Sequence, residues 1–279
     1  METLEILFPK VKNVISPVSA DGKPAITVTN LAGKCTSLSY QPHQTIQDLQ
    51  KEVMRAMHIM CEQQVLLYNG IELKTTDVKG KNMTLADHNV QPNSTIRLLV
   101  RLYEVPDELD HVIFQLSWGF PSTGKDYLDA TVFLYKGAKF VEVVDYQHCT
   151  SRFGSITHSG DILNLFRGIG HHKINVSIKS LQHDIDTLVF TLSSWKSPNI
   201  SKFKNPSLRF FDENFPEQQL CSDEMEHAAL SQAIIMCCLS KSKDSCWKVY
   251  SLKTLSSGNA MNYEPLQQKI ASLIQQGFV

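Results

Sequence analysis

VLLYNGIEL at residues 65–73 and STIRLLVRL at residues 94–102 are two apolar strings separated by a polar stretch that contains several lysines. Their length and apolar content predict two strands. The second string does not end the chain, because Tyr103, Glu104 and Val105 follow it and more than half of the sequence lies beyond them. This segment therefore has no free carboxyl end.

The residues before these strings predict a hairpin and a helix. AITVTNL, from residue 25, alternates as a strand, and the chain turns at an Ala-Gly pair and returns as KCTSLSYQP. Thr45 is in the position of a helix N-cap, with Asp48 three residues later, and apolar residues follow at helical spacing: Ile46, Leu49, Val53, Ala56 and Met57. A hairpin, a helix and two further strands in this order predict a β-grasp fold. Residues 1–24, which end in the turn-forming string SPVSADGKP, are predicted as an extension before it.

The sequence over about residues 25–102 also resembles the ubiquitin family. Members of that family bind most partners through three apolar side chains on one face of the sheet. The matching positions are Leu31, Leu67 and Leu99, and Arg97 is on the same predicted strand as Leu99. The resemblance implies a docking face for a protein partner, because outward leucines leave apolar area in water unless something covers them. The alternative is that the three leucines pack against the second domain.

Two departures from ubiquitin limit this resemblance. No Gly-Gly pair follows Leu102, so the domain lacks the carboxyl end through which ubiquitin is attached. The positions whose lysines most often extend ubiquitin chains match Ile71 and Pro92, which carry no amine. We therefore expect a docking module that is not conjugated, with a transient contact that buries less than about 1,200 Å².

The composition is that of a folded chain with balanced charge. At 279 residues the chain is long enough for about two domains. Its 27 basic and 28 acidic side chains leave no net field to attract nucleic acid or anionic lipid, although a local patch could do so. No apolar run approaches the roughly 20 residues that span a bilayer, and the seven cysteines are irregularly spaced, which favours reduced thiols. These features predict a cytoplasmic protein with no nucleic-acid or membrane partner.

The second half of the sequence predicts an all-β sandwich, because from residue 111 it alternates densely and turns often. The strings LSWGF, YLDATVFL, VDYQHCTSRFGSITHSGD, INVSI, LVFTL and LRFFD, in this order, resemble the TerD-like family associated with tellurite and general stress resistance. The most specific string is GSITHSGD at residues 154–161. The predicted fold class is α+β, with an N-terminal ubiquitin-like β-grasp domain (25–103), a linker (104–110) and a TerD-like β-sandwich with peripheral helices (111–279).

The TerD resemblance implies a calcium site at one end of the sandwich, built from acidic side chains on one strand and in one loop. Asp129 and Asp161 match that pattern, Asp126 is one residue out of place, and Tyr127 stands where an aspartate is expected. Other residues occupy further positions where the family places carboxylates: Gly168, Gly170, His171 and His172. Because calcium affinity depends on the number of charged ligands, the leading interpretation is a degenerate calcium site.

A change of metal is the alternative at this site. His158, His171 and His172, together with Asp129 or Asp161, would supply imidazole nitrogens, which suit zinc better than calcium. Adjacent histidines on a strand point to opposite faces, so only one of His171 and His172 would face a shared ion. We expect no bound cofactor, and calcium or zinc is the alternative.

Catalysis is not expected, and no catalytic residue is predicted. His148 and Cys149 are neighbours in the sequence, but adjacent residues of a strand do not reach one another and no orienting acid is evident. The sequence contains no phosphate-binding loop, nucleophile elbow, zinc-protease motif or dinucleotide fingerprint.

Two further segments have apolar residues at helical spacing. The string DEMEHAALSQAIIMCCLSK at residues 223–241 is predicted as a helix that packs on the sandwich, with Cys237 and Cys238 as small buried hydrophobes. The string YEPLQQKIASLIQQGFV at residues 263–279 is predicted as a packed terminal helix, with a dimer seam as the alternative. Its apolar face consists of Leu266, Ile270, Leu273 and Ile274.

Taken with the two resemblances, these features predict a non-enzymatic intracellular binding or adaptor protein that acts in a stress or defence response. Its protein partners would bind the ubiquitin-like face. The alternative function is a metal-binding stress-resistance protein that acts through the sandwich.

Overall fold

A computed structural model describes residues 24–122, 126–225, 230–242 and 244–278 of the chain. The chain divides into two compact units. The N-terminal unit ends at Leu98 but leaves out residues 62–65, and the C-terminal unit contains those four residues and everything from Leu99 onward. Each unit is described by itself. The predicted N-terminal extension, residues 1–24, lies outside the described residues except for its last residue.

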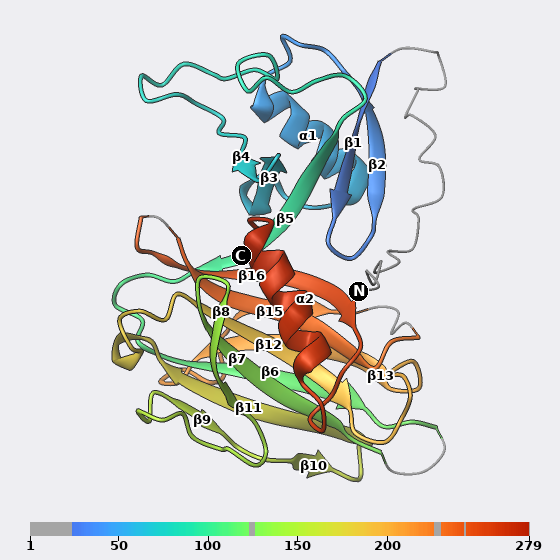
Figure 1. Cartoon of the computed structure of the whole chain (residues 1–279), viewed down its shortest axis with the longest axis vertical. Helices are drawn as coiled ribbons and strands as arrows, with labels where there is room; N and C mark the ends of the chain where they lie inside the picture. Colours follow the sequence, from blue (N-terminus) through green and yellow to red (C-terminus); the bar gives the residue numbers. More distant parts are fainter. Residues whose placement is uncertain (1–23, 123–125, 226–229, 243, 279) are drawn as a thin grey trace, which may run out of the picture. The chain divides into compact units, whose positions relative to one another are not determined.

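The N-terminal unit has the predicted β-grasp order (Figure 1). The strand β1 pairs antiparallel with β2 and parallel with the first half of β5, and β3 pairs with both β4 and β5. The helix α1 follows the β1–β2 hairpin in the sequence. The elements are β1 (Ala25–Asn30), β2 (Cys35–Ser39), α1 (Ile46–Met57), a 3-10 turn (Cys61–Gln63), β3 (Gln64–Tyr68), β4 (Ile71–Glu72) and β5 (Thr95–Glu104).

The helix α1 begins where the sequence predicts. The Thr45 hydroxyl accepts a hydrogen bond from the Asp48 amide at 3.1 Å and so satisfies one of the unpaired N–H groups of the first turn. The helix ends at His58, whose backbone is left-handed with φ 59°. Its buried face carries the predicted residues Ile46, Leu49, Val53 and Met57. The N-cap is therefore confirmed, and four of the five predicted apolar positions are buried, whereas Ala56 is exposed.

The strand β5 serves two sheets. Its first residues, Thr95–Leu98, pair with β1. Its later residues belong to the C-terminal unit and pair antiparallel with β16 (Trp247–Ser256), with Val100 opposite Ser251 and Glu104 opposite Lys248. The Val105 amide continues this contact by donating to the Trp247 carbonyl at 2.9 Å.

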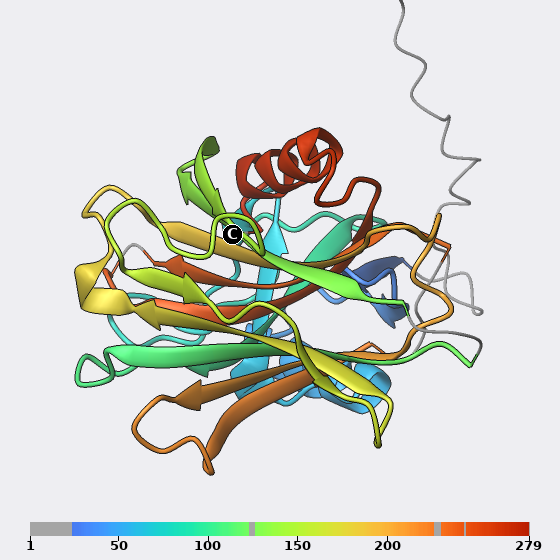
Figure 2. The ribbon, with the colours of Figure 1, turned by 90° about the horizontal axis from the view of Figure 1, so that it is seen from below.

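The C-terminal unit is the predicted β-sandwich. One sheet has the order β5–β16–β15–β12–β7–β8, and the other has the order β10–β11–β6–β13–β14, with β9 also paired to β11. Figure 2 shows the sheets as layers, with α2 on the outer side of the first sheet, where it contacts β8, β15 and β16. The elements are β6 (His111–Gly119), β7 (Leu128–Lys136), β8 (Lys139–Val144), β9 (Ile156–His158), β10 (Ile162–Asn164), β11 (Ile169–Ser177), a 3-10 turn (Ile178–Ser180), β12 (Thr187–Ser194), β13 (Lys204–Asp212), β14 (Gln219–Glu224), β15 (Ala233–Lys241), β16 and α2 (Glu264–Gln275).

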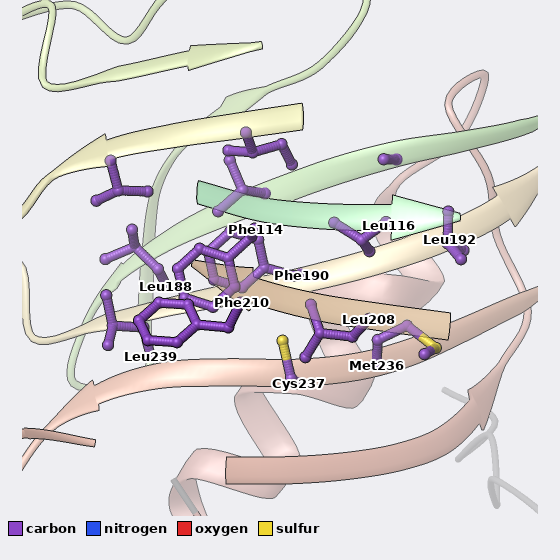
Figure 3. Close-up of a cluster of buried hydrophobic side chains, with 14 of the residues drawn as sticks. Phe114, Leu116, Leu188, Phe190, Leu192, Leu208, Phe210, Met236, Cys237 and Leu239 are labelled. Carbon is purple, nitrogen blue, oxygen red and sulfur yellow. The ribbon is translucent and has the colours of Figure 1, made fainter. Parts of the chain in front are cut away.

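The apolar core of this unit lies between the two sheets (Figure 3). Phe114 on β6 stacks on Phe190 of β12 with ring centroids 3.9 Å apart, and Phe210 on β13 lies 4.8 Å from Phe114. All three phenylalanines are completely buried. These rings join the facing sheets, because large buried aromatic side chains contribute most of the contact area in such a core.

The prediction of a helix over residues 223–241 is wrong. Residues 219–224 form the strand β14, and Ala233–Lys241 form β15, which lies between β12 and β16 in the middle of the first sheet. All residues of β15 except Lys241 are buried, including Cys237 and Cys238, as predicted for these two thiols. A strand that is covered on both faces shows a continuous apolar run, and periodicity alone cannot tell such a run from a buried helix.

The prediction of a packed terminal helix is confirmed by α2. Leu266, Ile270 and Leu273 are buried against the chain itself, and the Tyr135 hydroxyl donates to the Gln267 carbonyl at 3.3 Å. Proline is at the second position of the helix, where its missing N–H costs no intrahelical bond.

Candidate functional site

A buried carboxylate on β7 is the most unusual polar group of the C-terminal unit. The neighbours Leu128 and Ala130 belong to the core, so the alternating pleat of the strand directs Asp129 to the outer side of the sheet. Its Oδ2 is buried and has no hydrogen-bond partner among the described residues. Burial, together with the negative charges of Asp161 and Asp145, raises the pKa of Asp129 to about 7. This carboxyl therefore holds a proton at mildly acidic pH.

Protein donors engage the other carboxylates of this group. Asp145 follows β8 and accepts hydrogen bonds from the His148 amide at 2.7 Å, the Gln147 amide at 2.9 Å and the Tyr263 hydroxyl at 2.8 Å. Burial raises the pKa of Asp145, but these donors more than offset burial and leave its pKa below the ordinary value. Asp126 forms an ion pair with Lys202.

His158 on β9 is locked by two backbone groups. Its Nδ1 accepts a hydrogen bond from the Gly160 amide at 3.0 Å, so Nε2 carries the proton and donates to the Ala130 carbonyl at 3.1 Å. Burial, and then the nearby ring of His172, lower the pKa of His158 to about 4. This histidine is therefore neutral at physiological pH, and neither ring nitrogen is open to a ligand.

His172 on β11 is also held by backbone groups, but both of its ring nitrogens face oxygen acceptors. The ring is completely buried, with Nε2 2.9 Å from the Leu128 carbonyl and Nδ1 3.1 Å from the Gly160 carbonyl. The Asp161 carboxylate is 3.4 Å from Nε2. Burial lowers the pKa of His172, and these oxygen atoms act against that effect. His171 lies on the opposite face of β11, as the alternation of a strand requires.

These side chains do not fit a calcium ion, which takes about six to eight oxygen ligands. A lysine engages Asp126, three N–H and O–H donors engage Asp145, and a buried imidazole lies beside Asp161. They do not fit zinc either, because the nitrogens of His158 and His172 face backbone groups and His171 points away. Within the described ranges, no three His, Cys, Asp or Glu side chains are grouped as a metal site.

The neighbours His148 and Cys149 lie in a loop after β8, and the expectation that no acid orients His148 is wrong. Its Nδ1 is 3.3 Å from the Asp145 carboxylate. The exposed Cys149 thiol, however, donates to the Tyr146 carbonyl at 3.2 Å. The Asp145 carboxylate also accepts a hydrogen bond from the Tyr263 hydroxyl, which is 118 residues away in the sequence. Sequence reasoning missed Asp145 and Tyr263, since no local pattern connects them.

The four predicted docking residues differ in exposure. Leu67 and Leu99 retain 6% and 4% of their surface, Leu31 is half-buried and Arg97 is exposed. Leu31 and Arg97 are therefore the members of this set that expose substantial surface.

Among the helices that the structure describes, none combines the length and the apolar content needed to cross a membrane.

Comparison with known proteins gives two family matches. The TerD domain family matches residues 78–262, and the ubiquitin family matches residues 26–103. The two matches overlap over residues 78–103, which include most of β5, the strand that pairs in both units.

Two solved structures are similar to part of this chain. One is a protein of unknown function, SAV2460, with 15% identity and a TM-score of 0.47; the match covers 57% of this chain and 96% of that protein. The other is a homologue of the telluride resistance protein TerD from Streptomyces coelicolor A3(2), with 14% identity and a TM-score of 0.46; the match covers 56% of this chain and 96% of that protein. Because the TerD family matches well over half of the sequence, this chain belongs to the TerD domain family, and it carries a ubiquitin-family domain ahead of its sandwich.

Proposed function

We propose that this chain is a non-enzymatic adaptor, in which the ubiquitin-like domain docks a protein partner and the TerD-like domain acts in a stress response without bound calcium. The observation that carries the proposal is the course of β5. In ubiquitin the last strand leads to the carboxyl end that is attached to a target, whereas here the later part of β5, from Val100 to Glu104, pairs with β16. A ubiquitin fold with no free carboxyl end acts through its surface.

Two accessible side chains define the proposed contact. Leu31 supplies apolar area and Arg97 supplies a charge that can pair with a carboxylate of the partner. Leu67 and Leu99 are buried, so truncating them would cost about 2–5 kcal/mol of stability each and would confuse lost binding with unfolding. Leu31 and Arg97 are therefore the positions at which docking can be tested without damage to the core.

Titration of the full chain against a panel of purified ubiquitin-binding domains tests the docking. The double substitution Leu31→Ala with Arg97→Ala should weaken binding at least tenfold and leave the thermal midpoint unchanged. Lys79→Ala, at an exposed position of the loop before β5, is the matched control and should bind like the unmodified protein. Equal binding by all three proteins would place docking elsewhere, and no binding to any domain would count against a ubiquitin-like docking role.

A metal-binding stress-resistance protein is the second candidate function. The buried, unpartnered Oδ2 of Asp129 near three further carboxylates is the observation that favours it. Isothermal titration of the chelator-treated protein with calcium and with zinc separates the two candidates. Absence of heat from both ions supports the adaptor without metal. Saturable heat that Asp129→Asn removes would support the metal-binding function.

A further inference from the structure

The hairpin that joins β10 to β11 exposes several apolar side chains. Phe166 is 99% exposed and Leu165 is 59% exposed, and three neighbouring residues each expose more than a third of their surface: Ile162, Leu163 and Ile169. One exposed phenylalanine is ordinary in a folded protein, but five large apolar side chains exposed within eight residues are unusual, and exposed apolar area of this kind normally has a partner.

This apolar tip is a defined turn at the edge of the second sheet. The Asn164 side chain accepts a hydrogen bond from the Arg167 amide at 2.9 Å, and Gly168 takes the left-handed φ of 63° that the turn needs. The Gly168 carbonyl accepts from the Phe120 amide at 2.7 Å, which ties the turn to the end of β6. Figure 1 shows β10 at the outer edge of its sheet. The tip is therefore held in a position in which it projects from the sandwich.

Basic side chains cover the sheet face next to the tip. Lys173 on β11 and Arg209 on β13 lie on either side of Gln115, in the same row of the sheet. Lys204 lies opposite Gly119, close to the base of the hairpin, and Arg167 lies in the turn itself. Within the described ranges, none of these four basic residues has a carboxylate within 4.0 Å.

The nearest ionisable neighbours do not neutralise this face. His171 lies in the next row, and burial together with the charges of Lys173 and Arg209 lowers its pKa. Glu224 is on β14, in the same row as His171, and Asp161 lies beside the buried ring of His172, so two carboxylates stand against four basic side chains. The balanced charge of the whole chain therefore hides a local positive face.

We propose that this end of the sandwich binds the surface of membranes that contain anionic phospholipids. Leu165 and Phe166 insert among the acyl chains, and the four basic side chains of Arg167, Lys173, Lys204 and Arg209 face the headgroups. The inference rests on the apolar turn and the basic side chains together. Transfer of the turn out of water lowers the free energy, and so does the approach of the basic side chains to an anionic surface. A protein partner with an acidic surface would use the basic face but would have no need of a projecting apolar turn.

Sedimentation of the full chain with lipid vesicles tests this inference. Vesicles with about one third phosphatidylserine in phosphatidylcholine should bind the protein, pure phosphatidylcholine vesicles should bind it much more weakly, and added salt should reduce binding. Phe166→Ser should weaken binding about tenfold or more. The double substitution Lys173→Glu with Arg209→Glu should weaken it more than tenfold and reduce the salt dependence. All of these side chains lie on the surface, so the thermal midpoint should stay unchanged.

Phe215→Ser is the matched control. Phe215 is 57% exposed and follows β13 at the opposite end of that strand from Lys204, so its loss should not change vesicle binding. The inference would be overturned if the unmodified protein did not bind anionic vesicles, or if Phe166→Ser and Phe215→Ser bound equally. A titration with polyglutamate tests the alternative that this face binds a protein with an acidic surface. Polyglutamate binding that requires Lys173 and Arg209 but not Phe166, without vesicle binding, would assign the face to an acidic protein instead.

Discussion

Replacing Asp129 by asparagine should stabilise the C-terminal unit increasingly as the pH rises. The ordinary pKa of an aspartate is 3.8, and in the folded protein the pKa of Asp129 is about 7. Between these values the unfolded carboxyl is ionised while the folded one keeps its proton. Stability therefore falls as the pH rises through this window, because rising pH favours the unfolded state, which has released a proton that the folded state still holds.

The size of the effect follows from the distance between the two pKa values. A difference of about three pH units corresponds to a penalty of about 4 kcal/mol once both forms are ionised. At pH 5 only about 1–2 kcal/mol of this penalty is present, and at pH 8 nearly all of it is. The stability difference between Asp129→Asn and the unmodified protein should widen by about 2–3 kcal/mol over that range. Any constant cost of the buried amide cancels in this comparison.

Urea unfolding followed by tryptophan fluorescence measures this difference. The three tryptophans, at positions 118, 195 and 247, all lie in the C-terminal unit, so their signal reports its unfolding. A chelator in every buffer removes any contribution from bound metal. Glu217→Gln removes a charge at an exposed position and should give a difference that stays within about 0.5 kcal/mol across the range. A gap between Asp129→Asn and the unmodified protein that stays constant, or narrows towards pH 8, would refute the assigned environment of Asp129.

Three further outcomes follow from the packing and from the buried histidine. Phe190→Ala removes a ring whose centroid is 3.9 Å from that of Phe114, and urea unfolding should show a free energy of unfolding lower by about 3–5 kcal/mol. A loss below about 1 kcal/mol would contradict the central place of Phe190 in the core. Gly170→Ala would bring a methyl group to 2.5 Å from the Trp118 ring, so calorimetry should show a loss of stability of about 1–3 kcal/mol. An unchanged thermal midpoint would count against this close approach. The pKa of His158 is about 4 in the folded state and 6.5 ordinarily, so the unfolded state takes up the proton first and stability falls as the pH drops through this window. His158→Gln should therefore lose less stability than the unmodified protein between pH 6.5 and 4.5. Equal slopes of stability against pH for the two proteins would contradict the assigned environment of His158.

The N-terminal unit could be predicted well because its signals are local. A hydroxyl at Thr45 and apolar residues three and four positions apart specify a helix through contacts within the helix itself, and α1 begins and ends accordingly. The alternation in residues 25–30 and 35–39 likewise predicts the hairpin. The continuous apolar run at residues 233–241 has no such local meaning, because the sheet that covers it on both faces is formed by distant segments.

The candidate site was predicted only in part, for the same reason. Asp129, Asp161 and His158 could be identified from strings typical of the TerD family, but their chemical state depends on groups that the strings do not contain. Tyr263 reaches Asp145 across 118 residues, and the Ala130 and Leu128 carbonyls hold the two buried rings. Such contacts depend on the register between strands and on where α2 lies on the sheet.

The sequence by itself determined that a β-grasp domain precedes a TerD-like sandwich, because periodicity and family strings are properties of neighbouring residues. Only the tertiary structure decided that β5 pairs with β16, that Leu67 and Leu99 are buried, and that an apolar turn lies beside a basic row. Burial and charge neighbourhood are properties of segments brought together by strand pairing. A balanced composition can therefore coexist with a positive face, and three leucines that match a docking surface in the sequence can differ in the surface they expose.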